Sequence, residues 1–272
     1  YSQERSTRMA FKLLNCTHRH CVFTIDEELR HFFLEDRSLL NCLFRAVQSV
    51  ILRMFNKMNQ SQNFVPGFIC VLHTFGRPLE WNPHIHCILS EGGFSDNAIW
   101  RPVKHFNYTY LRNAFQTALL NEMEQHIGPS FKKIKAYIYH KDKNGFYVYA
   151  KPNLCDPNPV IKYIGRYLGR PVIALKRIDS YDGENVTFHY NRHEDNAYVK
   201  RTIPAIEFIK LLIQHIPEKH FKMIRYYGLY ARHRKIDAKL YRAIHQSKHR
   251  FIKGFTKWRQ DILLSFGYDP LF

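Results

Sequence analysis

The spacing of apolar residues predicts both strands and helices in the first half of the chain. β-Branched and aromatic residues cluster in short runs at 20–25, 68–75 and 84–90, with Pro and Gly nearby, which is typical of strands. A loop containing Gly-Arg-Pro joins the last two runs, and we expect them to pair as an antiparallel hairpin. Apolar residues at helical spacing predict helices over about 27–58 and 108–126.

The second half of the chain repeats this mixture in shorter pieces. Strand patterns occur, in chain order, at 133–140, 146–151, 172–178, 185–190 and 197–202. Helix-start signals that include proline predict helices at 160–168 and 204–215. The stretch from Arg225 onward is basic, and we expect it to be helical. These elements predict an α+β fold, in which helices flank a central antiparallel sheet and a basic extension follows.

The charge balance indicates the kind of partner. The 272 residues include 41 Lys and Arg against 23 Asp and Glu, which gives a formal net charge of +18 and a pI near 9.7. Such an excess favours a polyanionic partner, because each contact with a phosphate releases counterions. Aromatic residues make up 15% of the chain and can stack on unpaired bases. We therefore expect a nucleic acid as the partner.

Other features of the composition bear on where the protein works. No run approaches the roughly 18 consecutive apolar residues of a membrane helix, so we expect no membrane span. None of the six cysteines forms a CxxC pair, which favours reduced thiols in the cytoplasm over a disulfide framework. The chain starts at Tyr1 rather than at Met and shows no signal peptide, and we interpret this as a trimmed beginning.

A pair of histidines on one predicted strand could hold a metal ion. His84 and His86 are two residues apart, so both imidazoles project from one face of the strand while Ile85 points the other way. His73, on the partner strand of the hairpin, could reach across as a third ligand. The alternative is a pair of structural histidines, because about one His-x-His is expected by chance among 16 histidines.

A second group of possible zinc ligands lies near the start of the chain. Cys16, His18, His20 and Cys21 together resemble a small zinc cluster. Their spacing matches no common zinc knuckle, and strand alternation would point them to opposite faces. We therefore interpret this segment as a basic, half-buried first strand.

A pair of tyrosines could supply a nucleophile. Tyr163 and Tyr167 are four residues apart on a predicted helix, so they share a face, and Lys162, Arg166 and Arg170 lie near them. A phenol with a pKa near 10 is a poor nucleophile until cations or a base stabilise the phenolate. Both residues could instead be core aromatics or rings that stack on DNA.

A pair of tyrosines four residues apart can also arise by chance. Among 17 tyrosines about one Tyr-x3-Tyr pair is expected at random, and Tyr226 with Tyr230 is a second example. The tyrosine spacing alone therefore does not identify a nucleophile.

The order and wording of longer segments is more specific. Four blocks carry a resemblance to a known family: THRHCVFTIDEELR, LHTFGRPLEWNPHIHCILSEGG, VIKYIGRYLGRPVIA and VTFHYNRHEDNAYVKRTIPAIEFIKLLIQHIPEKHFKMIRYYGLYARHRK. They resemble the HUH-type transposases of rolling-circle insertion sequences, namely the IS-ninety-one family and its common-region (ISCR) relatives, with the Helitrons more distant. The blocks cover almost the whole chain, from about His18 to Lys235.

The resemblance implies an architecture. It implies an HUH endonuclease-type fold, in which a central antiparallel sheet presents the histidines and a tyrosine-bearing helix packs over it. Residues 1–178 would form the catalytic domain, and residues 179–272 a C-terminal strand and basic helical extension. Family members usually begin with a cysteine-rich zinc-binding domain, and nothing in this sequence matches it.

The resemblance also implies a chemistry. His84 and His86 match the paired histidines that hold a divalent cation, for which we expect magnesium or manganese, and His73 is our own addition to that ligand set. Tyr163 and Tyr167 match the paired tyrosines, which attack DNA and leave a 5′-phosphotyrosine and a free 3′-hydroxyl.

The expected partner is single-stranded or hairpin DNA at transposon ends, in the nucleoid of a bacterial cytoplasm. Candidate DNA contacts are basic residues near the tyrosines or in the C-terminal stretch: Lys162, Arg166, Arg170, Arg225, Arg232, Arg234 and Lys235. Three alternatives stay open: a plasmid or phage replication initiator of the same chemistry, a non-enzymatic single-strand binder, and a metal-dependent phosphodiesterase that activates water. The oligomeric state does not follow from the sequence.

Overall fold

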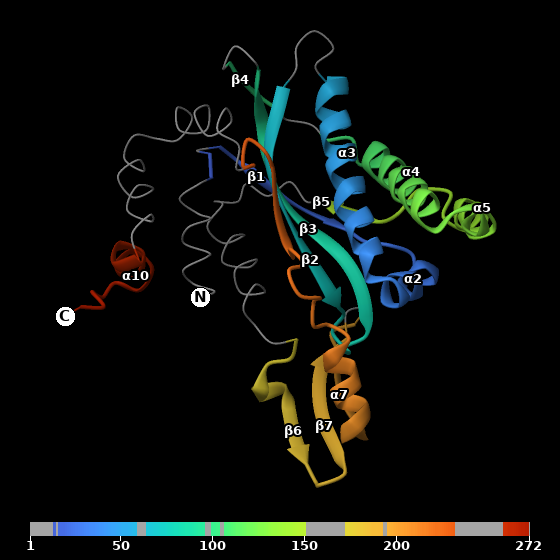
Figure 1. Ribbon diagram of the computed structural model, residues 1–272, viewed down its shortest axis with the longest axis vertical. Helices are drawn as coiled ribbons and strands as arrows, with labels where there is room; N and C mark the ends of the chain where they lie inside the picture. Colours follow the sequence, from blue (N-terminus) through green and yellow to red (C-terminus); the bar gives the residue numbers. More distant parts are fainter. Residues whose placement is uncertain are drawn as a thin grey trace.

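A six-stranded antiparallel sheet is the centre of the computed structural model, and its strands run in the order β5-β1-β3-β2-β9, with β4 paired to β3 (Figure 1). The structure describes residues 13–14, 16–58, 64–95, 99–103, 106–150, 172–192, 195–231 and 258–271. The strands of this sheet are β1 (His18–Phe23), β2 (Phe64–Phe75), β3 (Trp81–Ser95), β4 (Trp100–Pro102), β5 (Val148–Ala150) and β9 (Ile224–Gly228). The predicted α+β class is confirmed, and so is the predicted antiparallel hairpin, which is β2 with β3.

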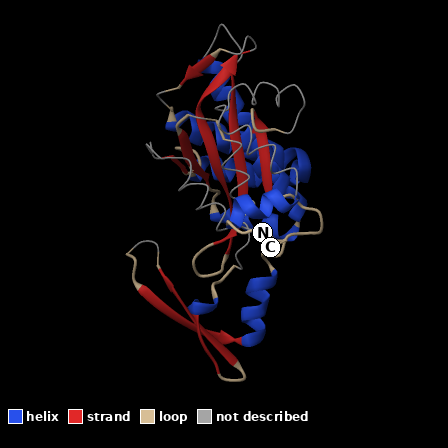
Figure 2. Cartoon of the chain, turned by 90° about the vertical axis from the view of Figure 1, so that its left-hand side faces the viewer, coloured by secondary structure: helices blue, strands red, loops and turns tan. Residues whose placement is uncertain are grey.

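Helices cover one face of this sheet. They are α2 (Arg30–Glu35), α3 (Leu40–Met58), α4 (Tyr108–Ile127) and α5 (Lys132–Lys141), with short 3-10 turns at Glu27–Leu29, Arg37–Leu39 and Pro129–Phe131. Helix α3 lies next to the sheet and α4 packs outside it (Figure 1), and Figure 2 shows the helices behind the strands. Because strand side chains alternate, Phe68, Cys70, Ile85 and Cys87 all point into the core that α3 completes. The opposite face carries the histidines.

A smaller unit with its own core lies at one end of the sheet. It consists of the three-stranded sheet β6-β7-β8 and helix α7, with bounds Ile178–Tyr181, Asn185–Asn191, Tyr198–Pro204 and Ala205–Ile213. Its core contains Phe188 and Phe208 together with Leu79, which comes from the turn between β2 and β3. Figures 1 and 2 show this unit below the main sheet. The small core is therefore anchored to the hairpin of the main sheet.

Three secondary-structure predictions were wrong. The segment predicted as a strand at 133–140 is the helix α5. The pattern misled because Ile134 and Ile138 are four residues apart, a spacing that fits a helix as well as a strand. Of these two residues, only Ile138 is buried. The strand predicted at 172–178 begins only at Ile178, after a 3-10 turn at Leu175–Arg177. The predicted helix from Arg225 begins instead as strand β9.

The C-terminal part of the chain therefore contributes to the main sheet. Aromatic and β-branched residues of Ile224–Gly228 favour a strand, and this strand pairs antiparallel with β2 from Gly67↔Gly228 to Val71↔Ile224. Further on, α10 (Trp258–Phe266) is helical. The proposed division at 178/179 stays a prediction.

The central helix is the one segment in the described part of the chain that is long and apolar enough to cross a membrane. By length and composition the stretch Arg37–Asn56 meets that test, but 61% of it is buried inside the protein. Its buried side chains include Phe44, Val47 and Ile51, and all three belong to the main core. This helix therefore serves as the central core helix of the fold.

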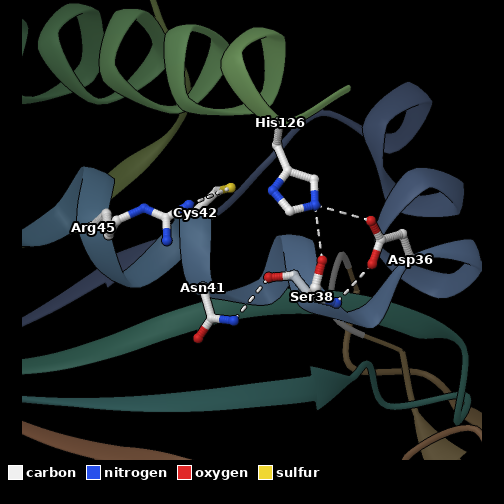
Figure 3. A network of polar contacts seen from close by, with 6 residues as sticks. All are labelled: Asp36, Ser38, Asn41, Cys42, Arg45 and His126. Carbon is white, nitrogen blue, oxygen red and sulfur yellow. Dashed lines mark hydrogen bonds and ion pairs between the residues drawn. The ribbon is translucent and has the colours of Figure 1, made fainter. Parts of the chain in front are cut away.

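A polar cluster joins the start of α3 to the end of α4 (Figure 3). The Asp36 carboxylate accepts a hydrogen bond from the Ser38 backbone N–H at 2.9 Å, and its other oxygen lies 3.1 Å from Nε2 of His126. The Ser38 hydroxyl lies 2.9 Å from the same nitrogen. Because serine and aspartate meet one ring nitrogen, this cluster cannot relay a proton through the imidazole. The hydrogen bond from Ser38 and the neighbouring His126 lower the pKa of Asp36.

Candidate functional site

Three histidines converge on the sheet face opposite the helices α2 to α5. His73 on β2 is directly opposite His84 on β3, and His86 follows two residues later on the same face. Their ring centroids are 5.5 Å apart for His73 and His84, 4.1 Å for His73 and His86, and 4.9 Å for His84 and His86. One nitrogen from each ring lies within 4.8 Å of the others. The structure thus brings together the three residues that the sequence suggested as ligands.

Burial keeps these imidazoles neutral. His73 and His86 are only 5% and 6% exposed, and His84 is half-buried. Burial lowers the pKa of His73 to about 3 and also lowers the pKa of His84 and of His86. At neutral pH each ring therefore keeps a lone pair, which is the form that binds a cation.

Hydrogen bonds orient the rings of His84 and His86. Nδ1 of His84 donates to the backbone carbonyl of Asn82 at 2.7 Å, which leaves Nε2 of His84 free of a proton. Nδ1 of His86 lies 2.9 Å from Nε2 of His20, on the neighbouring strand β1. Sequence reasoning assigned His20 only to a basic first strand and missed this contact. The missing information was the pairing of β1 with β3, since the residues are 66 positions apart.

The donor set fits a divalent cation. Three neutral imidazole nitrogens within reach of one point are a common arrangement for first-row divalent metals. The side-chain oxygen of Asn82, two residues before His84 on the same strand, is buried and has no hydrogen-bond partner in the described part of the chain. An additional oxygen acceptor beside the histidines suits a hard divalent ion or its bound water.

A cation from the helical layer lies close to this cluster. Arg30 is the first residue of α2, and its backbone carbonyl accepts a hydrogen bond from Nε1 of Trp81 at 2.9 Å. Its positive charge lowers the pKa of His84 further, after the larger effect of burial. Nε of Arg30 is buried and has no hydrogen-bond partner among the described residues. A buried guanidinium N–H whose charge acts on a candidate metal ligand is suited to contact a phosphate.

The predicted nucleophiles and most predicted DNA contacts lie outside the described residues. These positions are Tyr163, Tyr167, Lys162, Arg166, Arg170, Arg232, Arg234 and Lys235. Their roles stay predictions.

Arg225 is described, and it lies on the helical side of the sheet. Its guanidinium carbon is 3.9 Å from the centre of the Phe44 ring, and one of its nitrogens donates to the Asn41 side chain at 2.5 Å. Arg225 therefore does not join the histidines, which occupy the opposite face. Its predicted contact with DNA stays untested.

Tyr230, from the second tyrosine pair Tyr226 and Tyr230, has a clear packing role. The Tyr230 hydroxyl lies 2.5 Å from Nε2 of His18 and accepts a hydrogen bond from the Leu14 backbone N–H at 3.2 Å. Tyr230 is buried, and this burial raises its pKa well above the usual value. A phenol that is harder to ionise is a poor nucleophile. Tyr230 is therefore poorly suited to be the attacking residue.

The residues Cys16, His18 and Cys21, considered above as zinc ligands, have structural contacts instead. His18 uses both ring nitrogens, one with the Cys16 carbonyl at 2.8 Å and the other with Tyr230. Burial raises the pKa of the Cys16 thiol to about 12 and that of Cys21 as well. Within the described ranges, the grouping of His, Cys, Asp or Glu that could hold a metal is the three-histidine cluster.

Comparison with known proteins places this sequence in a family. Residues 67–237 match the family described as "Putative transposase" (Y2_Tnp). The chain is 28% identical over 233 residues to the "Transposase for insertion sequence element IS801" of Pseudomonas savastanoi pv. phaseolicola, covering 81% of this chain and 56% of the relative. It is 30% identical over 237 residues to the "Putative transposase y4qJ" of Sinorhizobium fredii, covering 80% of this chain and 59% of that relative.

The chain thus spans a little over half the length of these two curated relatives. No solved structure matches it. The family match covers the β2–β3 hairpin from Gly67 onward, with all three histidines, and extends through β9. Because this match covers well over half of the sequence, the chain belongs to the Y2_Tnp family of transposases.

Proposed function

We propose that this protein cuts and rejoins single-stranded DNA at the ends of an insertion sequence, using a tyrosine nucleophile and a divalent cation. The observation that carries the proposal is the convergence of three neutral imidazoles, two buried and one half-buried, in a member of a transposase family. A cation held there would offset negative charge on the scissile phosphate. The replication-initiator alternative shares this chemistry, and the names of the relatives favour transposition.

The chain's own residues would have distinct tasks. His73, His84 and His86 would hold the cation, and magnesium or manganese is the expected ion. The oxygen of Tyr163 would attack the phosphorus, the bond from phosphorus to the 3′-oxygen would break, and that oxygen would end as a 3′-hydroxyl after taking up a proton. The DNA would remain attached as a 5′-phosphotyrosine. Tyr167 would accept a second strand end in the same way.

The electrostatics of the protein would support this reaction. The net charge of +18 favours binding of the DNA backbone, and the positive charge of Arg30, which acts on His84, would add to the attraction for a phosphate. Rejoining needs no external energy source, because the phosphotyrosine bond retains the energy of the broken phosphodiester. The substrate would be single-stranded or hairpin DNA.

The deciding experiment is to trap the covalent intermediate. The protein is incubated with manganese and labelled single-stranded oligonucleotides that tile both ends of the element, and is then denatured and digested. We expect a labelled peptide that contains Tyr163 or Tyr167, and none from the double variant Tyr163→Phe/Tyr167→Phe. The exposed Tyr137 on α5 supplies the matched control, and Tyr137→Phe should retain the adduct.

Two outcomes would contradict the proposal. Cleavage without any covalent adduct would indicate a phosphodiesterase that activates water. Strong binding without cleavage, across all the oligonucleotides and with manganese present, would indicate a non-enzymatic single-strand binder.

A further inference from the structure

His20 contacts the three-histidine cluster without belonging to it. Strand β1 pairs with β3 so that Val22 is opposite His86 and His20 is opposite Ile88, which makes His20 the diagonal neighbour of His86 on the same face. Nε2 of His20 lies 2.9 Å from Nδ1 of His86. The two ring planes are nearly parallel, at 12°, with centroids 5.1 Å apart.

A hydrogen bond between two neutral imidazoles contains one proton. Which of the two rings carries this proton decides whether Nε2 of His86 can bind a cation. If Nδ1 of His86 carries the proton and donates it to His20, then Nε2 of His86 has a lone pair for a cation. If Nε2 of His20 carries the proton instead, neutral His86 has its own proton on Nε2 and cannot use that atom as a ligand. The contact therefore couples the tautomer of His86 to that of His20.

The two oriented ligands differ in how they are held. His84 donates to the backbone carbonyl of Asn82, an acceptor that no side-chain substitution removes. The partner of His86 at Nδ1 is a side chain, so substitution of His20 can change it. Second partners of this kind fix the tautomer and the ring direction of histidine ligands.

We infer that His20 is a positioning residue of the cation site: its Nε2 accepts the Nδ1 proton of His86 and so directs Nε2 of His86 toward the ion. This inference rests on the proposed function, since it requires a cation at the three histidines. His20 is absent from the group of residues whose ligand atoms converge, so its role is to orient a ligand.

The test measures manganese affinity without DNA and without turnover, by calorimetric titration of the purified protein. His20→Gln keeps an acceptor at a similar reach, whereas His20→Asn is one methylene shorter and cannot maintain the contact. We expect His20→Asn to bind manganese about 10- to 100-fold more weakly than wild type, and His20→Gln to bind close to the wild-type level. The control is His140→Asn, at an exposed position on α5, which should leave the affinity unchanged.

Rescue of activity gives a second readout. High manganese should restore oligonucleotide cleavage by His20→Asn, because the ligands themselves remain, and should not restore cleavage by His86→Ala. Equal manganese affinity in wild type and His20→Asn would overturn the positioning role while leaving the cation site in place. Failure of wild type to bind manganese would overturn the cation site itself.

A third measurement observes the tautomer directly in the unaltered protein. Nitrogen NMR of protein labelled with ¹⁵N-histidine distinguishes the two neutral tautomers, and the His86→Ala spectrum assigns the signal. We expect neutral His86 to carry its proton on Nδ1. A proton on Nε2 of His86 would overturn the inference.

Discussion

Removal of the Tyr230 hydroxyl should measure how firmly the end of β9 is held to the rest of the fold. Tyr230→Phe keeps the ring, which packs so closely on β2 that a Cβ at Gly67 would lie 2.7 Å from it. The substitution deletes the contact with His18 at 2.5 Å and the bond from the Leu14 N–H at 3.2 Å. Each lost bond contributes about 1 kcal/mol, and a buried N–H left without its partner costs more. We expect the free energy of unfolding to fall by about 2–3 kcal/mol.

The assay is urea denaturation followed by circular dichroism, with Tyr137→Phe as the control. Tyr137 is 51% exposed, so its variant should change the free energy of unfolding by less than about 0.5 kcal/mol. If Tyr230→Phe also changed it by less than about 0.5 kcal/mol, the assigned hydrogen bonds would not contribute as reasoned. Because the ring remains, the variant should still form the covalent adduct with DNA when folded.

The difference between wild type and Tyr230→Phe should also depend on pH. Burial raises the pKa of Tyr230 well above the value of about 10 in an unfolded chain, so the folded state retains the phenol proton more tightly. The resulting stability is complete below pH 10 and decreases as the pH rises above 10, by up to about 1.4 kcal/mol per pH unit. The phenylalanine variant has no phenol at this position, so its free energy of unfolding lacks this decrease above pH 10. The two unfolding free energies should therefore approach each other above pH 10, and a constant difference would contradict the assigned burial.

Three further predictions concern the site and the partner. His84→Ala or His86→Ala should reduce metal-dependent cleavage by roughly 100-fold or more while single-strand binding persists; cleavage by His84→Ala at the wild-type rate in chelator-treated buffer would exclude the histidine site. Arg30→Gln should slow cleavage more than Arg30→Lys does, because lysine keeps the positive charge that acts on His84; equal rates for wild type and Arg30→Gln would remove Arg30 from the site. Fluorescence anisotropy should show that binding prefers unpaired to duplex DNA and weakens steeply with salt, as the net charge of +18 implies; binding insensitive to salt would contradict a backbone-contacting surface.

The arrangement of the histidines could be predicted from the sequence because it follows from local geometry. Strand alternation places His84 and His86 on one face whatever the rest of the fold does. The position of His73 required only that two neighbouring strands form a hairpin, which the medium-length loop between them allowed. Both inferences depend on contacts close in sequence.

Contacts between distant segments could not be predicted in this way. The role of His20 depends on the pairing of β1 with β3, and no local pattern specifies that pairing. Arg225 was interpreted as part of a basic helix because its charged neighbours dominate the pattern. Its segment forms a strand because it pairs with β2, and its guanidinium packs on Phe44. Both contacts join residues that are far apart in the sequence. The helix α5 was mistaken for a strand because apolar residues four apart satisfy both periodicities.

The late return of β9 to the main sheet has a consequence for how the protein is made. Strand β2, which carries His73, has β3 on one side and β9 on the other, and β9 is synthesised some 150 residues after β2. Until Ile224–Gly228 has left the ribosome, β2 is an edge strand whose backbone groups from Gly67 to Val71 lack their final partners. The nascent chain would then expose an unpaired apolar edge on the hairpin that carries the histidines, and such edges template aggregation. Any fragment that ends before β9 would keep that edge, so a fragment made for expression should extend at least through Gly228.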